Sequence, residues 1–237
     1  GRIRMYSSDS EIKKRKITLI LAAAGIGKRM GLDYPKQFFE HNGKPLFIFP
    51  LEIAEKSSLI DEIIIVTNEN NIDLVEKQCN KYNIKKVKKI LAGGKERQDS
   101  IYNALKEDEG STYILVQDGV RPFMKEKYIE MTCAALDRDK SLAGAVIGVP
   151  VKDTIKVVGL DGEILATPNR AGLVAVHTPQ TFRGDILKKA YKKAEAEKFL
   201  GTDDSSLVER IGEKVKIITG DYDNIKITTL EDLLSLK

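Results

Sequence analysis

Hydrophobic residues along this chain gather in short continuous runs, and each run is followed by a longer segment in which they recur with helical spacing. The first run, residues 17–24, is apolar almost throughout and ends at Gly25, which indicates a strand covered on both faces. Further short β-rich runs lie at 62–67, 87–91, 113–117 and 143–149. The spacing predicts helices near residues 45–56, 70–81, 96–107 and 125–136.

This alternation of strands and helices predicts the fold class. It is typical of an α/β protein with a Rossmann-like, doubly wound and mostly parallel sheet. In such sheets ligands bind at the carboxyl ends of the strands. We therefore expect the candidate chemistry in the loops that follow strands.

The pattern changes after residue 150. Two short apolar runs, 151–158 and 163–166, flank an Asp161-Gly162 pair that suits a tight reversal between antiparallel strands. We interpret residues of about 151–177 as a projecting β-arm. Because a lone hairpin has little core of its own, its apolar side chains predict a homodimer that covers the arm. The remaining expected elements are helices at 185–198 and 203–211, a strand at 214–219 and a helix near 230–236.

Residues 17–237 are expected to form a single domain, and residues 1–16 a disordered lead. We interpret Gly1 to Arg4, ahead of Met5, as additions to the natural chain. The whole chain has 39 Lys and Arg against 35 Asp and Glu, and removing the six basic and two acidic residues of the lead leaves 33 of each. This balance gives nucleic-acid binding no support from composition.

Several other classes of site are disfavoured. Cys79 and Cys133 lack the spacing of a zinc or redox pair, and His41 and His177 belong to no metal-binding motif. No apolar run approaches the roughly 20 residues of a membrane span, and no apolar signal core precedes Ile17. We expect a soluble, cytoplasmic protein that acts without nucleic acid or membrane, and any metal should arrive with a substrate.

The loop after the first strand, residues 23–31, reads Ala-Ala-Gly-Ile-Gly-Lys-Arg-Met-Gly, and phosphate binding is the favoured interpretation. It is not a Walker A loop, because Arg29 stands where a Ser or Thr hydroxyl should bind magnesium. It is not a dinucleotide fingerprint, because Met30 occupies the position of the third glycine. The loop alone also fits a plain strand-to-helix turn.

Lys36, which follows Pro35, would join Arg29 in a cationic clamp. Such a clamp suits nucleotidyl transfer, because attack on an α-phosphorus builds negative charge that cations stabilise. A phosphate monoester is already mostly dianionic at neutral pH, so the reaction needs no general base.

Two later motifs also follow strands. Gly93-Gly94-Lys-Glu-Arg-Gln-Asp-Ser100 can present N–H groups and a hydroxyl to a base edge or a phosphate, or can be a simple turn. Asp118 ends a strand and can hold magnesium on a triphosphate or merely cap a helix. Arg121 can meet an acceptor phosphate. Polar residues at 151–156 and at Asn169-Arg170 suit insertion into a dimer partner, or are solvated strand residues.

These motifs, together with Thr178-Pro-Gln-Thr-Phe182, Thr202-Asp-Asp and Asn224-Ile-Lys-Ile-Thr-Thr229, resemble those of one family in the same order. The chain is similar to the methylerythritol phosphate cytidylyltransferases of the non-mevalonate isoprenoid pathway, which are homodimers that exchange a β-arm. The resemblance implies transfer of CMP from CTP to 2-C-methyl-D-erythritol 4-phosphate, by in-line attack of the acceptor phosphate on the α-phosphorus. The products are 4-diphosphocytidyl-2-C-methyl-D-erythritol and pyrophosphate, and Mg²⁺ binds with the triphosphate.

The resemblance also implies roles for individual residues. The catalytic residues are Arg29, Lys36 and Lys226. The CTP-binding residues are Ala23, Ala24, Gly25, Gly27, Gly93, Gly94, Arg97, Ser100, Asp118 and Gly119. The acceptor-binding residues are Arg121, Thr154, Arg170 and Thr202, and of these Thr154 and Arg170 come from the partner's arm. Asp118 is also the candidate metal ligand.

Three alternatives stay open. Ribitol-5-phosphate cytidylyltransferases share the chemistry and most motifs, and only Ala24 and the segment that begins at Thr202 favour the isoprenoid enzyme. A non-catalytic nucleotide sensor of this fold would lack Arg29, Lys36 or Lys226, and all three are present. An NAD-dependent dehydrogenase is disfavoured by Met30.

Overall fold

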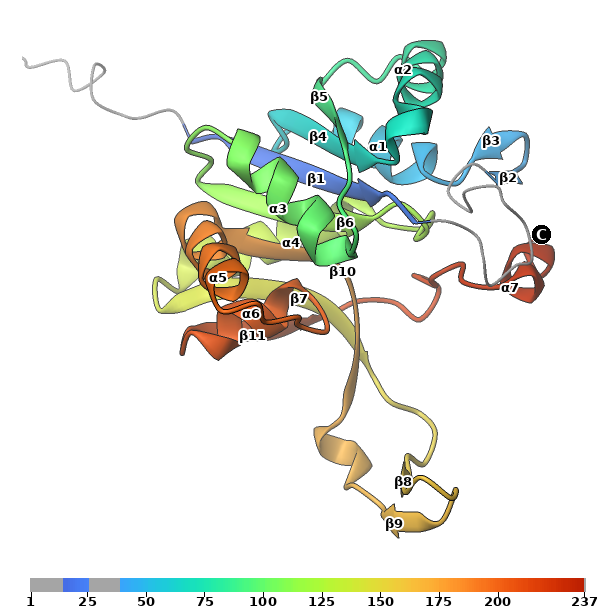
Figure 1. Ribbon diagram of the computed structural model, residues 1–237, viewed down its shortest axis with the longest axis vertical. Coiled ribbons are helices and arrows are strands. Elements are labelled where there is room, and N and C mark those ends of the chain that lie inside the picture. The colour runs from blue at the N-terminus through green and yellow to red at the C-terminus, as the bar shows by residue number, and fades with distance from the viewer. Residues whose placement is uncertain (1–14, 26–38, 237) are drawn as a thin grey trace, which may run out of the picture.

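The computed structural model describes residues 15–25 and 39–236 (Figure 1). Its main strands are β1 (Ile17–Ala23), β4 (Glu62–Thr67), β5 (Val87–Ala92), β6 (Tyr113–Asp118), β7 (Leu142–Pro150), β10 (Val174–Arg183) and β11 (Lys214–Thr219). They form one seven-stranded sheet in the order β11-β7-β10-β6-β1-β4-β5. The strands predicted outside the arm all belong to this sheet.

The sheet is mostly parallel. β1 pairs in parallel with β4 and β6, β4 with β5, and β7 with β11, whereas β10 is antiparallel to both β6 and β7. The predicted α/β class with a doubly wound, mostly parallel sheet is confirmed. β10 was not predicted, because it carries buried polar residues instead of an apolar run. Its register shifts between Val176 and Gln180, around Pro179, which has no N–H to give to a ladder.

The helices follow the predicted segments with shifted ends. They are α1 (Ile48–Lys56), α2 (Ile72–Lys81), α3 (Arg97–Glu107), α4 (Glu126–Arg138), α5 (Gly184–Ala196), α6 (Asp204–Arg210) and α7 (Leu230–Leu234), with single 3₁₀ turns η4 (Glu69–Asn71) and η5 (Arg170–Gly172). α1 begins later than predicted because β2 (Glu40–His41) and β3 (Lys44–Pro45) form a small hairpin first. Asn42 and Gly43 at its turn have φ of 53° and 74°, the left-handed conformation that two-residue hairpin turns require.

Two apolar layers cover the sheet, one on each face. Successive residues of a strand point to opposite faces, so Leu19 and Leu21 of β1 pack with α1, α2 and α4, while Ile20 packs with α3, α5 and α6. The second group of helices lies in front of the sheet in Figure 1. Burial on both faces explains why these strands are continuous apolar runs. No helix in the described part of the chain is long and apolar enough to cross a membrane.

The chain leaves the sheet after β7 and returns in β10. Between them it projects far from the sheet and carries the short strands β8 (Val157–Val158) and β9 (Ile164–Ala166), which pair with each other (Figure 1). The strand predicted over 151–158 is thus reduced to two residues. Residues 174–176, which were assigned to the arm, pair with β7 instead. Apolar side chains of the arm are exposed in the single chain, among them Val158, Leu160, Ile164 and Leu165.

Candidate active site

The carboxyl ends of the parallel strands β1, β4, β5 and β6 meet at one edge of the sheet. The backbone N–H of Gly93, just after β5, donates to the carbonyl of Thr67 at 2.7 Å, and the Thr67 hydroxyl donates to the carbonyl of Ala23 at 3.0 Å. On the other side of β1, the N–H of Gly119 donates to the carbonyl of Ala22 at 2.9 Å. These bonds bring the two glycine motifs and the end of β6 together, as the fold class requires.

The second glycine turn is packed tightly against the first. A Cβ atom on Gly93 would lie 2.6 Å from Oγ of Ser100 and 2.7 Å from Cβ of Ala24, so no larger residue fits without displacement. The Ser100 hydroxyl accepts from the N–H of Gly94 at 3.0 Å and donates to the carbonyl of Glu96 at 3.3 Å. Ser100 is buried. Its hydroxyl therefore shapes the turn that the sequence predicts to bind CTP.

Asp118, the last residue of β6, is surrounded by cations. Its Oδ1 accepts from Nε of Arg97 at 3.2 Å, while Oδ2 lies 3.5 Å from Nε of Arg121 and 4.0 Å from Nζ of Lys226. Burial alone would raise the pKa of the Asp118 carboxyl, but the charges of Arg97, Lys226 and Arg121 outweigh burial and lower it. Asp118 is therefore ionised at neutral pH.

The C-terminal segment delivers Lys226 to this cluster. The N–H of Ile227 donates to the carbonyl of Val120 at 2.9 Å, and Nη1 of Arg121 donates to the carbonyl of Asn224 at 2.8 Å. Asn224 is buried, whereas the Lys226 side chain is 42% exposed. The anchored backbone thus presents a solvent-accessible ammonium group beside Asp118.

Arg97 holds a second carboxylate. Its Nη2 donates to Oδ2 of Asp204 at 3.0 Å, and the hydroxyl of Tyr191 donates to Oδ1 of the same residue. The Asp204 side chain is fully buried. Burial opposes the charge of Arg97, but Asp204 and Asp118 outweigh it and raise the pKa of its guanidinium. Sequence reasoning assigned no role to Asp204 or Tyr191; the only signal was the position of Asp204 beside Thr202 in a recognised motif.

His177 is another residue that sequence reasoning missed. It lies on β10 beside Arg121, and its Nδ1 is buried without a hydrogen-bond partner among residues 15–25 and 39–236. Burial, and then the charge of Arg121, lower the pKa of the imidazole to about 4. His177 is therefore neutral at physiological pH.

The remaining predicted site residues lie elsewhere. Gly27, Arg29 and Lys36 fall outside the described residues. Gly25 ends the described part of the first loop and is exposed, and Thr202 is exposed in the loop before α6. Thr154 and Arg170 are exposed on the arm, where the Arg170 guanidinium donates to the carbonyl of Lys152. The arm projects away from the sheet that contains β6, the strand that ends at Asp118 (Figure 1).

The oxygen atoms of the cluster around Asp118 show whether these residues could help to bind Mg²⁺. Within the described ranges no group of three or more His, Cys, Asp or Glu side chains could hold a metal ion. Asp118 offers one ionised carboxylate, and among the described residues its Oδ2 has only the long contacts to Arg121 and Lys226. One carboxylate together with substrate phosphates and water is the ligand set that Mg²⁺ commonly takes. Asp118 therefore fits a metal that binds with the triphosphate.

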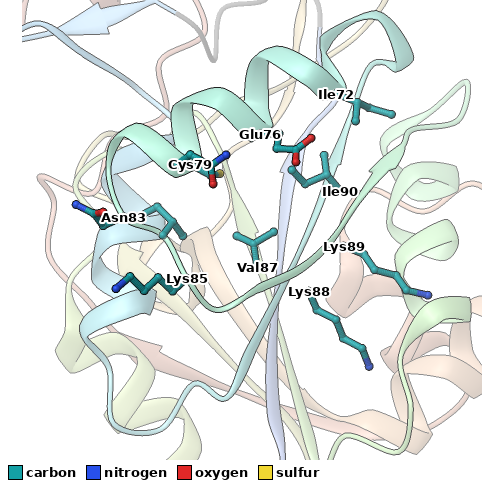
Figure 2. A pocket seen from close by; sticks show the side chains of 11 residues that line it. Ile72, Glu76, Cys79, Asn83, Lys85, Val87, Lys88, Lys89 and Ile90 are labelled. Atoms are coloured by element: carbon teal, nitrogen blue, oxygen red, sulfur yellow. The ribbon is translucent and has the colours of Figure 1, made fainter.

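A hollow of about 530 Å³ lies apart from this cluster, between α2 and β5 (Figure 2). Its lining includes Cys79, Lys88 and Lys89. Burial, and then the nearby Glu76, raise the pKa of the Cys79 thiol to about 12, so it is a poor nucleophile. Lys88 and Lys89 are paired with acidic side chains. The hollow contains none of the predicted site residues.

Residues 17–237 match the model of the family described as 2-C-methyl-D-erythritol 4-phosphate cytidylyltransferase. The protein of that name from Fusobacterium nucleatum subsp. nucleatum is 54% identical over 234 residues, which cover 98% of this chain and 100% of that protein. The one from Clostridium perfringens strain SM101 is 45% identical and covers 92% of this chain and 96% of its own length. The crystal structure of 4-diphosphocytidyl-2C-methyl-D-erythritol synthase from Anaerococcus prevotii superposes with a TM-score of 0.81 at 33% identity, covering 94% of this chain and 96% of that one. The chain therefore belongs to the 2-C-methyl-D-erythritol 4-phosphate cytidylyltransferase family, whose members are nucleotidyltransferases.

Proposed function

We propose that this protein transfers CMP from CTP to 2-C-methyl-D-erythritol 4-phosphate and releases pyrophosphate. The observation that carries the proposal is the convergence of Arg97, Arg121 and Lys226 on Asp118, beside the Gly93-Gly94 turn. This arrangement provides both a tight turn for a nucleotide and cations for phosphate groups. Family membership supports the choice of CTP and of this acceptor.

The proposed reaction is an in-line displacement. An oxygen of the acceptor phosphate attacks the α-phosphorus of CTP, the new P–O bond joins CMP to the acceptor, and the bond to pyrophosphate breaks. Negative charge grows on the equatorial oxygens, and Arg29 and Lys36 would stabilise it. The acceptor phosphate is mostly dianionic near neutral pH, so no side chain has to remove a proton.

Arg121 would bind the acceptor phosphate, and Lys226 would join Arg29 and Lys36 as a catalytic cation. The exposed ammonium group of Lys226 can reach an incoming phosphate while its backbone stays anchored to the turn after β6. Asp118 would supply one carboxylate ligand to Mg²⁺. When bound, the ion would neutralise part of the triphosphate charge and help pyrophosphate to leave.

We also propose that the site is completed by a second copy of the chain. Thr154 and Arg170 lie on an arm that projects from its own sheet, and the arm exposes Val158, Leu160 and Ile164. A homodimer would cover these apolar side chains and bring the two polar residues to the partner's acceptor site. Sedimentation equilibrium should give twice the mass of one chain, and a monomer at micromolar concentration would contradict the proposal.

Release of pyrophosphate from CTP with magnesium tests the function directly. The reaction is run with methylerythritol 4-phosphate, with ribitol 5-phosphate and without acceptor. Release with the first acceptor only is the expected result. Release with ribitol 5-phosphate only would assign the protein to the synthesis of polyol polymers, and no release with either would favour a nucleotide sensor.

A further inference from the structure

Arg97 occupies an unusual place in the site, because one guanidinium group joins three elements. It is the first residue of α3, and it contacts Asp118 at the end of β6 and Asp204 at the start of α6. Its Nε and Nη2 lie 3.2 and 3.1 Å from Oδ1 of Asp118, and Nη2 lies 3.0 Å from Oδ2 of Asp204. The direction of the guanidinium therefore depends on both carboxylates.

The carboxylate of Asp204 is held firmly. Its side chain has no exposed surface, and each of its oxygens has one partner, the hydroxyl of Tyr191 on Oδ1 and Arg97 on Oδ2. A carboxylate is costly to bury unless it is paired and hydrogen-bonded. Tyr191 is itself almost completely buried in α5, and its ring stacks on Tyr102 of α3. Tyr191 therefore fixes one oxygen of Asp204 and leaves the other to Arg97.

The next residue of α3 binds the loop that leads into α6. The side-chain amide of Gln98 donates to the carbonyl of Phe199 at 2.8 Å and accepts from the N–H of Gly201 at 2.9 Å. The first turn of α3 thus touches the loop that carries Thr202, while Ser100 in the same turn binds Gly94. The candidate nucleotide turn and the candidate acceptor loop share one short piece of helix.

We propose that Asp204 is a positioning residue of the nucleotidyl transfer site, acting through Arg97. It draws the guanidinium toward α6 and so sets the orientation of Asp118 at the metal and triphosphate position. Without the second carboxylate, Arg97 would be free to close on Asp118 alone and occupy oxygen atoms that the nucleotide complex requires. This role deepens the proposed function and depends on it only for the identity of the substrates.

Asp204→Asn removes the charge with almost no change in volume. Displacement of reacting groups by about 1 Å typically costs on the order of 100-fold in rate, so kcat/KM should fall by about 10- to 100-fold. The Kd for CTP with magnesium and no acceptor, measured by calorimetry, should rise by about tenfold, because a misdirected Asp118 would hold the metal and triphosphate less well. Glu209→Gln is the matched control, because it neutralises an exposed carboxylate of the same helix that accepts from Ser205. It should leave both constants unchanged.

A double-mutant cycle separates positioning from a general structural role. If Asp204 acts through Arg97, Asp204→Asn should change the Kd for CTP by less than about twofold in an Arg97→Gln background. An equal loss in both backgrounds, or wild-type constants for Asp204→Asn, would overturn the proposal. Because the cycle measures CTP binding, it remains decisive even if the wild-type protein uses a different acceptor, which would refute only the proposed function.

Tyr191→Phe covers the case in which Asp204→Asn does not fold. It keeps the buried ring and removes only the hydroxyl that holds Asp204. We expect a smaller rise of the Kd for CTP, which disappears in the Arg97→Gln background. An unfolded Asp204→Asn together with wild-type CTP binding by Tyr191→Phe would show that Asp204 serves stability alone.

Discussion

Protonation of His177 should destabilise the fold in mild acid. The imidazole is partly buried beside Arg121, and its Nδ1 has no hydrogen-bond partner, so a second proton would place a charge next to a guanidinium. The pKa falls from 6.5 to about 4 in the folded protein. Between these values the unfolded chain binds a proton at this position and the folded chain does not. The free energy of unfolding must therefore decrease as the pH is lowered through this window.

The size of the effect follows from the shift. One pKa unit corresponds to about 1.4 kcal/mol, so a shift from 6.5 to about 4 gives an upper bound of about 3.5 kcal/mol. Partial exposure of the ring lets water screen the charge, which reduces the expected loss to about 2 kcal/mol at pH 4.5. The stability that neutral His177 contributes is fully present above pH 6.5 and is lost as the pH falls through 4.

Urea unfolding at pH 7 and pH 4.5 measures this contribution when wild type is compared with His177→Gln. Between the two pH values wild type should lose about 2 kcal/mol more than the variant, because glutamine cannot be protonated. Carboxylates whose pKa is lowered, such as Asp118 and Asp137, titrate in both proteins and cancel in the comparison. His41→Gln removes the other histidine and is the control. Equal pH dependence of wild type and His177→Gln would refute the reasoning.

Two further predictions concern cations of the proposed reaction. Lys36→Ala should lower kcat by about 10²–10³-fold, because it removes a cation that stabilises the transition state. Lys56→Ala, at the exposed end of α1, is the control and should leave kcat unchanged. Steady-state kinetics measure both variants, and near-normal turnover by Lys36→Ala would contradict the role of Lys36. Arg170→Ala should raise KM for the acceptor more than KM for CTP. Lys189→Ala, an exposed position on α5, is the control and should change neither constant. Equal changes in both constants for Arg170→Ala would show that the arm does not bind the acceptor.

The central sheet could be predicted from the sequence because its parallel strands are buried on both faces. The segment β1 carries Leu19, Ile20 and Leu21, all fully buried, and such a short apolar run before a glycine is typical of a central strand. β10 could not be found in this way. Its Thr178, Gln180 and Thr181 are buried polar residues whose side chains make hydrogen bonds to other segments. Those partners are distant in sequence, so periodicity contains no sign of them.

The site was predictable only in part for the same reason. Position after a strand identified Asp118 and the Gly93-Gly94 turn, since the fold class places such residues at one edge. The sequence did not indicate that Asp204 would share Arg97 with Asp118, because 107 residues separate Arg97 from Asp204. Arg97 was expected to bind CTP, and the structure places it between two carboxylates. Whether it also contacts the nucleotide stays a prediction.

The charges of the cluster agree with a reaction that transfers no proton. Within the described residues, Arg97, Arg121 and Lys226 face two carboxylates, Asp118 and Asp204, which leaves one positive charge in excess before any substrate binds. The pKa of Asp118 is lowered, so this carboxylate is a poor general acid. The two carboxylates can therefore hold the cationic side chains at fixed places without neutralising the net positive charge of the cluster. An anionic nucleotide and an anionic acceptor would both be attracted to such a site, and the group that titrates nearest to neutral pH would be the acceptor phosphate itself, with its second pKa of about 6.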